Sequence, residues 1–176
     1  MRISFDLDEV LFVDAKEIEA EDQLPFPLNR IFIERLRKGT VRLIHELKAQ
    51  GFEVWIYTSS FRSTRYISTL FRNYGVRFDQ IVNGPRHLQE VQGKKKDPLP
   101  QKLPTFYHIA LHIDDEDAIH ANGRAYGFKT MKVCESDDQW VEKVLAEANR
   151  IRDLEARKEA ARKKEVHHDT VNVSTF

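Results

Sequence analysis

Cysteine is almost absent from this chain, because Cys134 is the single one among 176 residues. One cysteine cannot form an intramolecular disulfide, and it excludes a metal site built from several cysteines. An excess of charge is also missing, since 28 Lys and Arg residues stand against 28 Asp and Glu residues. A chain without net charge is not typical of a general nucleic-acid or membrane-surface binder, although it is compatible with a local basic patch.

Long hydrophobic runs are missing as well. No apolar stretch approaches the length of a membrane span, and the first residues lack the basic and then apolar segments of a signal peptide. We therefore expect a soluble, cytoplasmic protein that makes no contact with a membrane. The chain still has enough hydrophobic residues for a core, 41% of the total, and its length fits one domain with room for a tail.

Five short apolar runs are spaced along the chain as strands of a sheet would be. They are continuous rather than alternating, which is typical of parallel strands that helices cover on both faces. Amphipathic helical patterns lie between them, and two of these patterns end at Gly51 and Gly75, as helices often do. The five runs are Ile3–Phe5, Val54–Tyr57, Gln80–Val82, Ile109–Ile113 and Thr130–Val133.

This alternation of strands and helices predicts an α/β fold, a Rossmann-like three-layer sandwich with a central parallel sheet. A C-terminal helix should follow, because Trp140–Ile151 carries an apolar stripe and the sequence after Leu154 is mostly charged. We expect a main domain at residues 1–152, and a charged helical extension with a flexible tail at residues 153–176. A homo-oligomer, if one forms, should form through that helix.

Polar residues gather where three of the apolar runs end. The first run leads into Asp6 and Asp8, the second into Thr58–Ser60, and the fourth into Asp114–Asp117. Ligands of open α/β sheets bind beyond the carboxyl ends of the strands, so these residues should meet at one edge. Asp6 and Asp8 should lie on the same side of an extended segment, because side chains alternate along it.

Several carboxylates at one edge need a cation, because otherwise some of them would take up protons near neutral pH. A hard divalent ion such as Mg²⁺ suits a set of oxygen ligands. Hydroxyl groups and a lysine beside such an ion would form a site for a phosphate, with positive charge where phosphoryl transfer needs it. The residues alone therefore indicate a magnesium-dependent phosphate site.

The motifs at these strand ends resemble those of the haloacid dehalogenase (HAD) superfamily of phosphohydrolases. The first HAD motif is an apolar strand followed by Asp-x-Asp-x-Thr/Val, which FDLDEVL matches, although Glu9 stands where the superfamily often has Gly. The second is an apolar strand ending in Thr or Ser, as in VWIYTS, and the fourth ends in two acids, as in ALHIDD. Bacterial receiver domains use similar parts, but there the acid pair comes first.

The resemblance covers residues 1–135 and implies a phosphatase that hydrolyses a phosphomonoester through an aspartyl-phosphate. Asp6 would be the nucleophile, and Asp8 would be the general acid and then the general base. Thr58 would hold a phosphoryl oxygen, and a lysine would neutralise the phosphoryl group and the nucleophile. Lys102 is the preferred lysine, and Lys94–Lys96 are its rivals.

The resemblance also implies Mg²⁺ as the cofactor and a set of binding residues. The second acid of the pair is preferred over the first as a ligand, and the metal candidates together are Asp6, Asp8, Asp114 and Asp115. The substrate-binding candidates are Ser59, Ser60, Arg62 and Arg65. A helix cap accounts equally well for the hydroxyl groups, and helix-surface charge accounts for the arginines. His112 is interpreted as a core histidine rather than a ligand.

Many members of this superfamily carry a cap domain over the site. The insertion Phe12–Lys38 is too short for a full helical cap, so the resemblance is to the capless type, whose open sites admit bulky substrates. Either the loop Glu19–Asn29 or an oligomer partner could cover the site instead. Two further alternatives stay open: a small-metabolite or nucleotide phosphatase, and a catalytically silent module that binds phosphate or metal. The balanced charge disfavours a nucleic-acid substrate.

Overall fold

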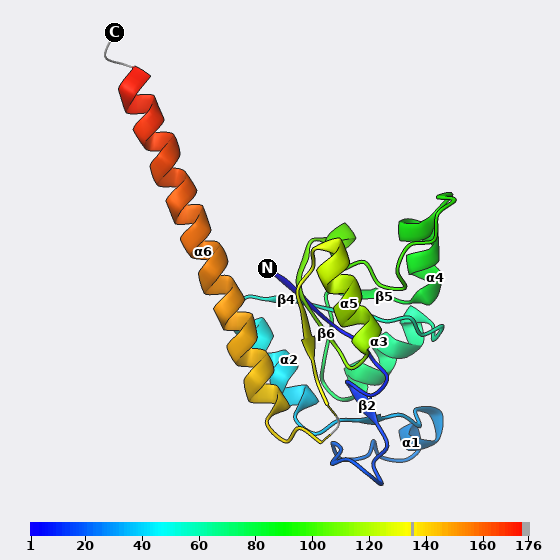
Figure 1. The fold of residues 1–176 in the computed structure, drawn as a ribbon. Helices are drawn as coiled ribbons and strands as arrows, with labels where there is room; N and C mark the ends of the chain where they lie inside the picture. Colours follow the sequence, from blue (N-terminus) through cyan, green and yellow to red (C-terminus); the bar gives the residue numbers. More distant parts are fainter. Residues whose placement is uncertain (135, 174–176) are drawn as a thin grey trace.

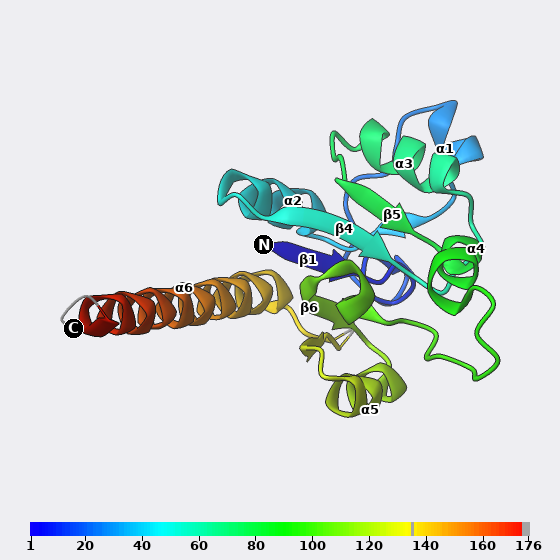
Figure 2. The same cartoon turned by 90° about the horizontal axis from the view of Figure 1, so that it is seen from above.

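A five-stranded parallel sheet forms the centre of the protein in the computed structural model, which describes residues 1–134 and 136–173, with side chains as far as Lys163. The spatial order of the strands is β5-β4-β1-β6-β7. Helices lie on both sides of the sheet (Figures 1 and 2). The predicted α/β sandwich with a central parallel sheet is therefore confirmed. The strands are β1 Arg2–Phe5, β4 Glu53–Tyr57, β5 Gln80–Val82, β6 Ile109–Asp114 and β7 Thr130–Lys132.

The helices between these strands end where the sequence indicates. Gly51 and Gly75 follow two of them with φ of 83° and 77°, a conformation that glycine adopts without strain. The second of these helices starts at Ser63, whose side chain accepts a hydrogen bond from the amide of Tyr66. The helical elements are α1 Leu28–Ile31, α2 Thr40–Ala49, α3 Thr64–Asn73, α4 Gly84–His87, η1 Leu88–Gln92, η2 Pro104–Tyr107, α5 Asp117–Tyr126 and α6 Trp140–Val173.

The insertion after the first strand forms a small hairpin. Its strands are β2 Phe12–Val13 and β3 Arg35–Leu36, which pair antiparallel. Leu24 and Phe32 of the insertion are buried in the main hydrophobic core, so the segment packs onto the sheet domain. This arrangement agrees with the expected lack of room for a full helical cap, while the capless subtype itself stays a prediction.

Helix α6 begins on the body of the protein and continues far beyond it (Figure 1). Its first turns bury Trp140, Val144 and Ile151 in the core, as the apolar stripe predicts. The helix then runs unbroken through the predicted boundary between residues 152 and 153 as far as Val173. The last part of the predicted tail, residues 174–176, lies outside the described residues.

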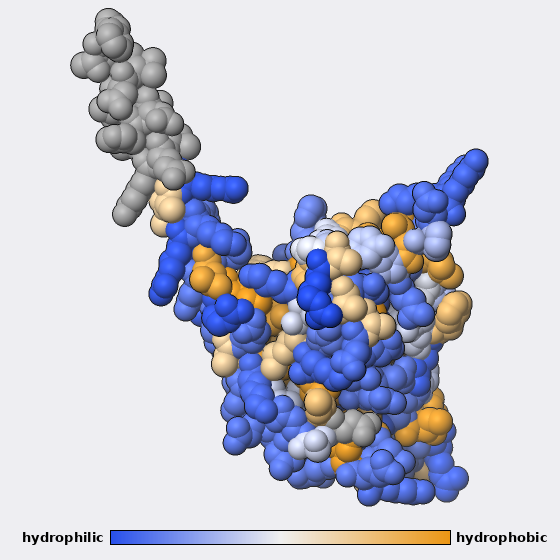
Figure 3. All heavy atoms as spheres, in the orientation of Figure 1, coloured by the Kyte–Doolittle hydropathy of each residue, from blue (hydrophilic) through white to orange (hydrophobic). Residues whose placement is uncertain are grey.

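Hydrophilic residues cover most of the visible face of the protein, and hydrophobic residues show at the junction of α6 with the body (Figure 3). On the projecting part of α6, ion pairs link Lys158 to Glu155 and Lys163 to Glu159. Within the described residues, no helix is both long and apolar enough to span a bilayer. The expected cytoplasmic location stays a prediction.

Candidate active site

Asp6 extends the central strand of the sheet by one residue. β1 pairs with β4 on one side and with β6 on the other, and the amide of Asp6 donates to the carbonyl of Ile113 at 2.9 Å. The next residue, Leu7, is completely buried in the core, and Asp6 itself is only 4% exposed. The strand therefore presents a buried carboxylate at the carboxyl edge of the sheet, between the ends of its two neighbours.

Asp8 lies in a different environment, on the turn that follows the strand. Its side chain is half exposed, and Oδ2 accepts a hydrogen bond from Arg62 Nη1 at 2.9 Å. The turn is tight, because Glu9 adopts a left-handed φ of 61°, and its amide donates to the carbonyl of Phe12. A left-handed residue at this position explains why Gly is frequent in the HAD motif that the sequence resembles.

Lys102 is the lysine that the structure brings to Asp6. Its side chain is completely buried, and Nζ lies 3.0 Å from Asp6 Oδ2 and 2.6 Å from Asp114 Oδ2. Burial disfavours the charged ammonium, but the two carboxylates outweigh it and raise the pKa of Lys102 above its usual value. The rival lysines Lys94–Lys96 are exposed on the loop after η1.

The acid pair at the end of β6 divides into two different residues. Asp114 is completely buried, and both of its oxygens are engaged: Oδ2 by Lys102 and by His112 Nε2 at 2.9 Å, Oδ1 by the amide of Glu116 at 3.0 Å. Burial acts to raise the pKa of Asp114, but the hydrogen bond with His112 and the charge and hydrogen bond of Lys102 hold it well below its usual range. His112 is a buried histidine with partners, as predicted.

Asp115 is partly exposed, and a hydrogen bond with the side chain of Glu9 favours its protonated form. Burial, together with the nearby carboxylates of Asp114 and Asp6, raises the pKa of Asp115 to about 7.

The three buried or half-buried carboxylates fit a divalent metal ion. One oxygen of each of Asp6, Asp114 and Asp115 lies within 4.8 Å of the others. Asp6 Oδ1 is buried and has no hydrogen-bond partner among the described residues, so this oxygen is available to a ligand. An all-oxygen donor set of this kind suits Mg²⁺. The side chain of Asp8, also a metal candidate, is instead engaged by Arg62.

The hydroxyl residues after β4 form a compact loop beside this cluster. Thr58 is buried, its amide donates to the carbonyl of Val82 on β5, and its hydroxyl oxygen accepts from the amide of Ser60 at 3.1 Å. Ser59 is half-buried, and a Cβ on Gly84 would come within 2.6 Å of its carbonyl oxygen. The turn at Gly84 therefore packs tightly against the loop and fixes its path.

Arg62 connects this loop to the insertion. Its guanidinium bonds to Asp8, to Ser60 Oγ at 2.9 Å and to Glu34 Oε1 at 3.0 Å. Tyr66 on α3 donates to the second oxygen of Glu34, and burial together with this bond raises the pKa of Tyr66 to about 12. Arg65, the other arginine candidate, is exposed on α3 and, within the part of the chain that the structure describes, forms no hydrogen bond or ion pair with this group.

Glu34 and Tyr66 are site residues that the sequence interpretation missed. Glu34 lies 28 residues from Arg62 in an insertion with no helical or strand pattern. In the sequence, Tyr66 looks like one of the apolar residues on the inner face of a helix, so nothing marks its hydroxyl group as a site residue. The one available signal was an acid, Glu34, placed directly after the apolar Ile31–Ile33.

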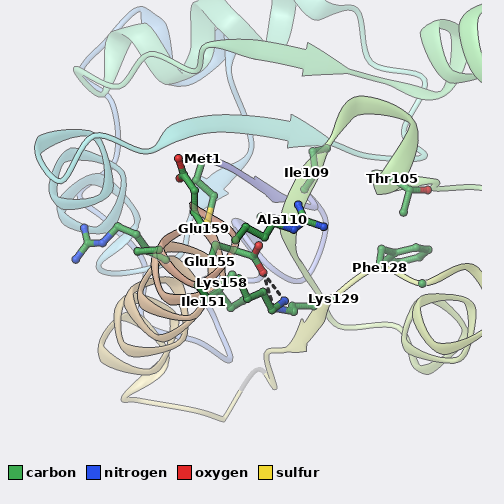
Figure 4. A pocket seen from close by; sticks show the side chains of 15 residues that line it. Met1, Thr105, Ile109, Ala110, Phe128, Lys129, Ile151, Glu155, Lys158 and Glu159 are labelled. Atoms are coloured by element: carbon green, nitrogen blue, oxygen red, sulfur yellow. Dashed lines mark hydrogen bonds and ion pairs between the residues drawn. The ribbon is translucent and has the colours of Figure 1, made fainter. Parts of the chain in front are cut away.

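A groove of about 1030 Å³ lies elsewhere, at the opposite end of the sheet (Figure 4). It is bounded by Met1 and Ile109 at the starts of strands, by Lys129 before β7 and by the projecting turns of α6. Lys129 and Glu155 approach each other across it at 4.0 Å. Because the carboxylates lie at the carboxyl ends of the strands, this groove is separate from the candidate active site.

Comparison with known proteins gives similarity of fold only. No family model and no curated protein matches the sequence. A HAD-superfamily hydrolase of subfamily IA from Geobacter sulfurreducens is similar in structure, with a TM-score of 0.48, 13% identity and coverage of 74% of this chain and 88% of that one. A predicted HAD-like family hydrolase from Porphyromonas gingivalis has a TM-score of 0.48 and 15% identity, covering 82% and 97%. An uncharacterized protein from Listeria monocytogenes serotype 4b has a TM-score of 0.47 and 21% identity, covering 79% and 84%.

Similarity at this level says nothing about the reaction. Only the residues of the site, namely Asp6, Lys102 and the acid pair, indicate the reaction.

Proposed function

We propose that this protein is a Mg²⁺-dependent phosphatase of the HAD type, which hydrolyses a phosphomonoester through an aspartyl-phosphate on Asp6. The observation that carries the proposal is the buried ion cluster in which Lys102 contacts Asp6 and Asp114 while Asp6 Oδ1 stays without a partner among the described residues. A buried carboxylate with one restrained oxygen and one available oxygen is suited to attack.

The metal would be held by Asp6 and Asp115, with Asp114 in support. When bound, Mg²⁺ would supply positive charge that offsets the charge of the phosphoryl group. Asp114 is the weakest of the three as a direct ligand, because the protein already engages both of its oxygens. Asp8 would contribute through its backbone carbonyl, as the HAD resemblance implies.

The chain's own residues then divide the two chemical steps. A carboxylate oxygen of Asp6 forms a bond to phosphorus as the bond from phosphorus to the leaving oxygen breaks, and Asp8 gives that oxygen its proton. Asp8 next takes a proton from a water molecule, which attacks phosphorus and releases Asp6 and inorganic phosphate. Lys102 balances the charge of the nucleophile, and Thr58 holds a phosphoryl oxygen.

Asp8 has to be released before it can act as an acid, because Arg62 holds one of its oxygens at 2.9 Å. We propose that Arg62 and the neighbouring hydroxyls, Ser59 and Ser60, bind the phosphate of the substrate and that Arg62 leaves Asp8 in doing so. A planar guanidinium suits a phosphate, to which it can donate two hydrogen bonds. Arg65 is a weaker candidate for phosphate binding, since it is exposed on α3.

The insertion borders the site through Glu34, which contacts Arg62. This border is a small hairpin rather than a domain, so we propose that a bulky phosphorylated substrate can enter. A small metabolite or nucleotide is the competing substrate class, and a nucleic acid is not indicated by the balanced charge. The alternative without turnover is a module that binds phosphate and metal.

The deciding experiment is release of phosphate from p-nitrophenyl phosphate and from a panel of small phosphoesters, phosphopeptides and nucleic-acid ends. The wild-type protein and Asp6→Asn are compared with Mg²⁺ and with a chelator. We expect turnover that requires Mg²⁺ and disappears in Asp6→Asn. Turnover that survives in Asp6→Asn would remove Asp6 as the nucleophile. Binding of Mg²⁺ and a metal-fluoride phosphate mimic without turnover of any substrate would favour the silent module.

A further inference from the structure

A line of buried polar side chains runs behind the proposed nucleophile. Ser4 and His112 are partners across β1 and β6, and Ser4 Oγ lies 2.8 Å from His112 Nδ1. His112 Nε2 lies 2.9 Å from Asp114 Oδ2, which in turn lies 2.6 Å from Lys102 Nζ. All four side chains are completely buried. Ser4 and His112 have no part in the chemistry described above, and a sheet core does not require two polar residues there.

We propose that Ser4 and His112 are positioning residues, which orient Asp114 so that it holds the ammonium of Lys102 against Asp6. The inference rests on the proposed function and adds two residues to that site. Neither of them touches the reacting atoms, because both act through Asp114.

The hydrogen bonds along this line have one consistent direction. An ionised Asp114 can only accept, so His112 must donate from Nε2. With Nε2 carrying the proton of a neutral imidazole, Nδ1 is unprotonated and accepts a hydrogen bond from the hydroxyl group of Ser4. The serine therefore selects the tautomer of His112 that can bind Asp114. Such outer partners commonly fix the orientation of groups that work in a site.

Lys102 needs this support because its segment has no regular secondary structure. It lies between η1 and η2, and its long side chain has many rotamers to lose. Its backbone is anchored on one side, where the amide of Leu103 donates to Tyr57 Oη at 2.8 Å, and Tyr57 Oη is 2.6 Å from His87 Nδ1. The ammonium is anchored at the other end, by Asp6 and Asp114.

Asp114 needs a residue that fixes its orientation, because the proposed metal ion and Lys102 compete for its carboxylate. One of its oxygens lies within 4.8 Å of oxygens of Asp6 and Asp115, so a metal ion at this cluster attracts it. The bond from His112 to Oδ2 opposes that pull and keeps the oxygen on Lys102. Without His112, Asp114 keeps the amide of Glu116 and the ammonium of Lys102 as partners but loses the bond that opposes the metal. Its Oδ2 can then turn toward the metal, which weakens one of the two carboxylate contacts of Lys102.

A pair of matched variants separates this role from simple packing. The amide of His112→Gln reaches the position of Nε2 and can still donate to Asp114, whereas the shorter amide of His112→Asn reaches only the position of Nδ1. We expect His112→Asn and Ser4→Ala to lower kcat about 10- to 100-fold with little change in KM. His112→Gln should retain most of the wild-type kcat, and His45→Asn, an exposed histidine on α2, serves as the control.

A second readout does not depend on turnover. The ammonium protons of Lys102 are buried between two carboxylates, so they should exchange slowly and give a ¹H–¹⁵N NMR signal that is absent in Lys102→Met. That signal should persist in His112→Gln and be lost or exchange much faster in His112→Asn and Ser4→Ala. Amide spectra establish that each variant is folded.

Persistence of the ammonium signal and of wild-type kcat in both His112→Asn and Ser4→Ala would overturn the positioning role while leaving Asp6-dependent hydrolysis intact. If the wild-type protein has no turnover on any substrate, the proposed function fails, and the ammonium signal still decides the positioning role on its own.

Discussion

Arg62 and Asp8 form an ion pair 2.9 Å long at the edge of the site, although they lie 54 residues apart in the sequence. The same guanidinium also contacts Glu34 of the insertion and Ser60 of the loop after β4. One side chain thus joins three segments that border the proposed phosphate site, and its removal should affect binding of the substrate more than folding.

Arg62→Met should raise KM about tenfold or more, because a charged hydrogen bond to the phosphate is lost. The change in kcat depends on Asp8, which is freed from the ion pair. The measurement is steady-state kinetics on the best substrate, with Arg72→Met on the exposed face of α3 as the control. An unchanged KM in Arg62→Met would remove this arginine from the substrate site.

Lys102→Met should impair both stability and activity. The carboxylates of Asp6 and Asp114 would stay buried without their cation, which costs about 3–5 kcal/mol of unfolding free energy. The value of kcat should fall by about 10²–10³ through loss of charge at the nucleophile. Urea unfolding and kinetics measure the two effects.

The exposed rival Lys95→Met is the matched comparison for Lys102→Met, and it should change neither quantity. Equal effects of the two substitutions would mean that the lysine near Asp6 in the working enzyme is not Lys102.

The stability of the metal-free protein should depend on pH through Asp115. In an unfolded chain this carboxyl ionises near pH 4, whereas in the folded, metal-free protein burial and the nearby carboxylates raise its pKa to about 7. A raised pKa of an acid means that the folded state binds its proton more tightly. This group therefore destabilises the fold progressively as pH rises from about 4 to 7.

Binding of Mg²⁺ should reverse that loss, because the ion binds the deprotonated carboxylate. The rise in Tm on adding Mg²⁺ should be larger at pH 8 than at pH 5, and Asp115→Asn should remove the difference. Thermal unfolding with Mg²⁺ and with a chelator gives all four values. A Mg²⁺ effect that is the same at both pH values would exclude Asp115 as the ligand that exchanges a proton for the metal.

The projecting part of α6 should be dispensable for the active site. Its core contacts end near Ile151, and the ion pairs beyond lie along its own surface, apart from the exposed Glu155, which approaches Lys129 of the body at 4.0 Å and should contribute little. A chain that ends at Leu154 should therefore keep the unfolding midpoint and kcat of the full chain. If the proposed homo-oligomer forms through α6, the shortened chain should elute as a monomer, which light scattering during gel filtration measures. An oligomer that survives the truncation would place the interface elsewhere.

The strands were predictable because burial on both faces leaves a continuous apolar run. Gln80–Val82 was predicted without error, and the other four strands differ by one residue at an end. Helix α6 continues further than we expected for such a charged sequence. Beyond the core, ion pairs between residues three and four apart link its successive turns. The irregular insertion gave no such pattern, so the β2–β3 hairpin could not be predicted.

The site was predictable in part for a similar reason. The order of the strands brings Asp6 and Asp114 to neighbouring ends of the sheet. The expected extended segment with Asp6 and Asp8 on one side is not formed, because β1 ends at Phe5 and Asp8 lies on the turn that follows. The choice between Lys102 and Lys94–Lys96 depends on the path of an irregular loop. The contact between Glu34 and Arg62 depends on how the insertion folds back onto the sheet. The local periodicity of the sequence predicts neither this contact nor the choice of lysine.

The place of β1 in the middle of the sheet has a consequence for how the protein is made. Its two neighbours are β4 and β6, and β6 is synthesised long after β1. While the chain is still emerging from the ribosome, Asp6 has neither Lys102 nor Asp114 beside it. Asp6, the proposed nucleophile, is therefore among the first residues of this chain to be translated, yet it gains these partners only after β6 has been made, so an incomplete chain cannot form the cluster of Asp6, Lys102 and Asp114.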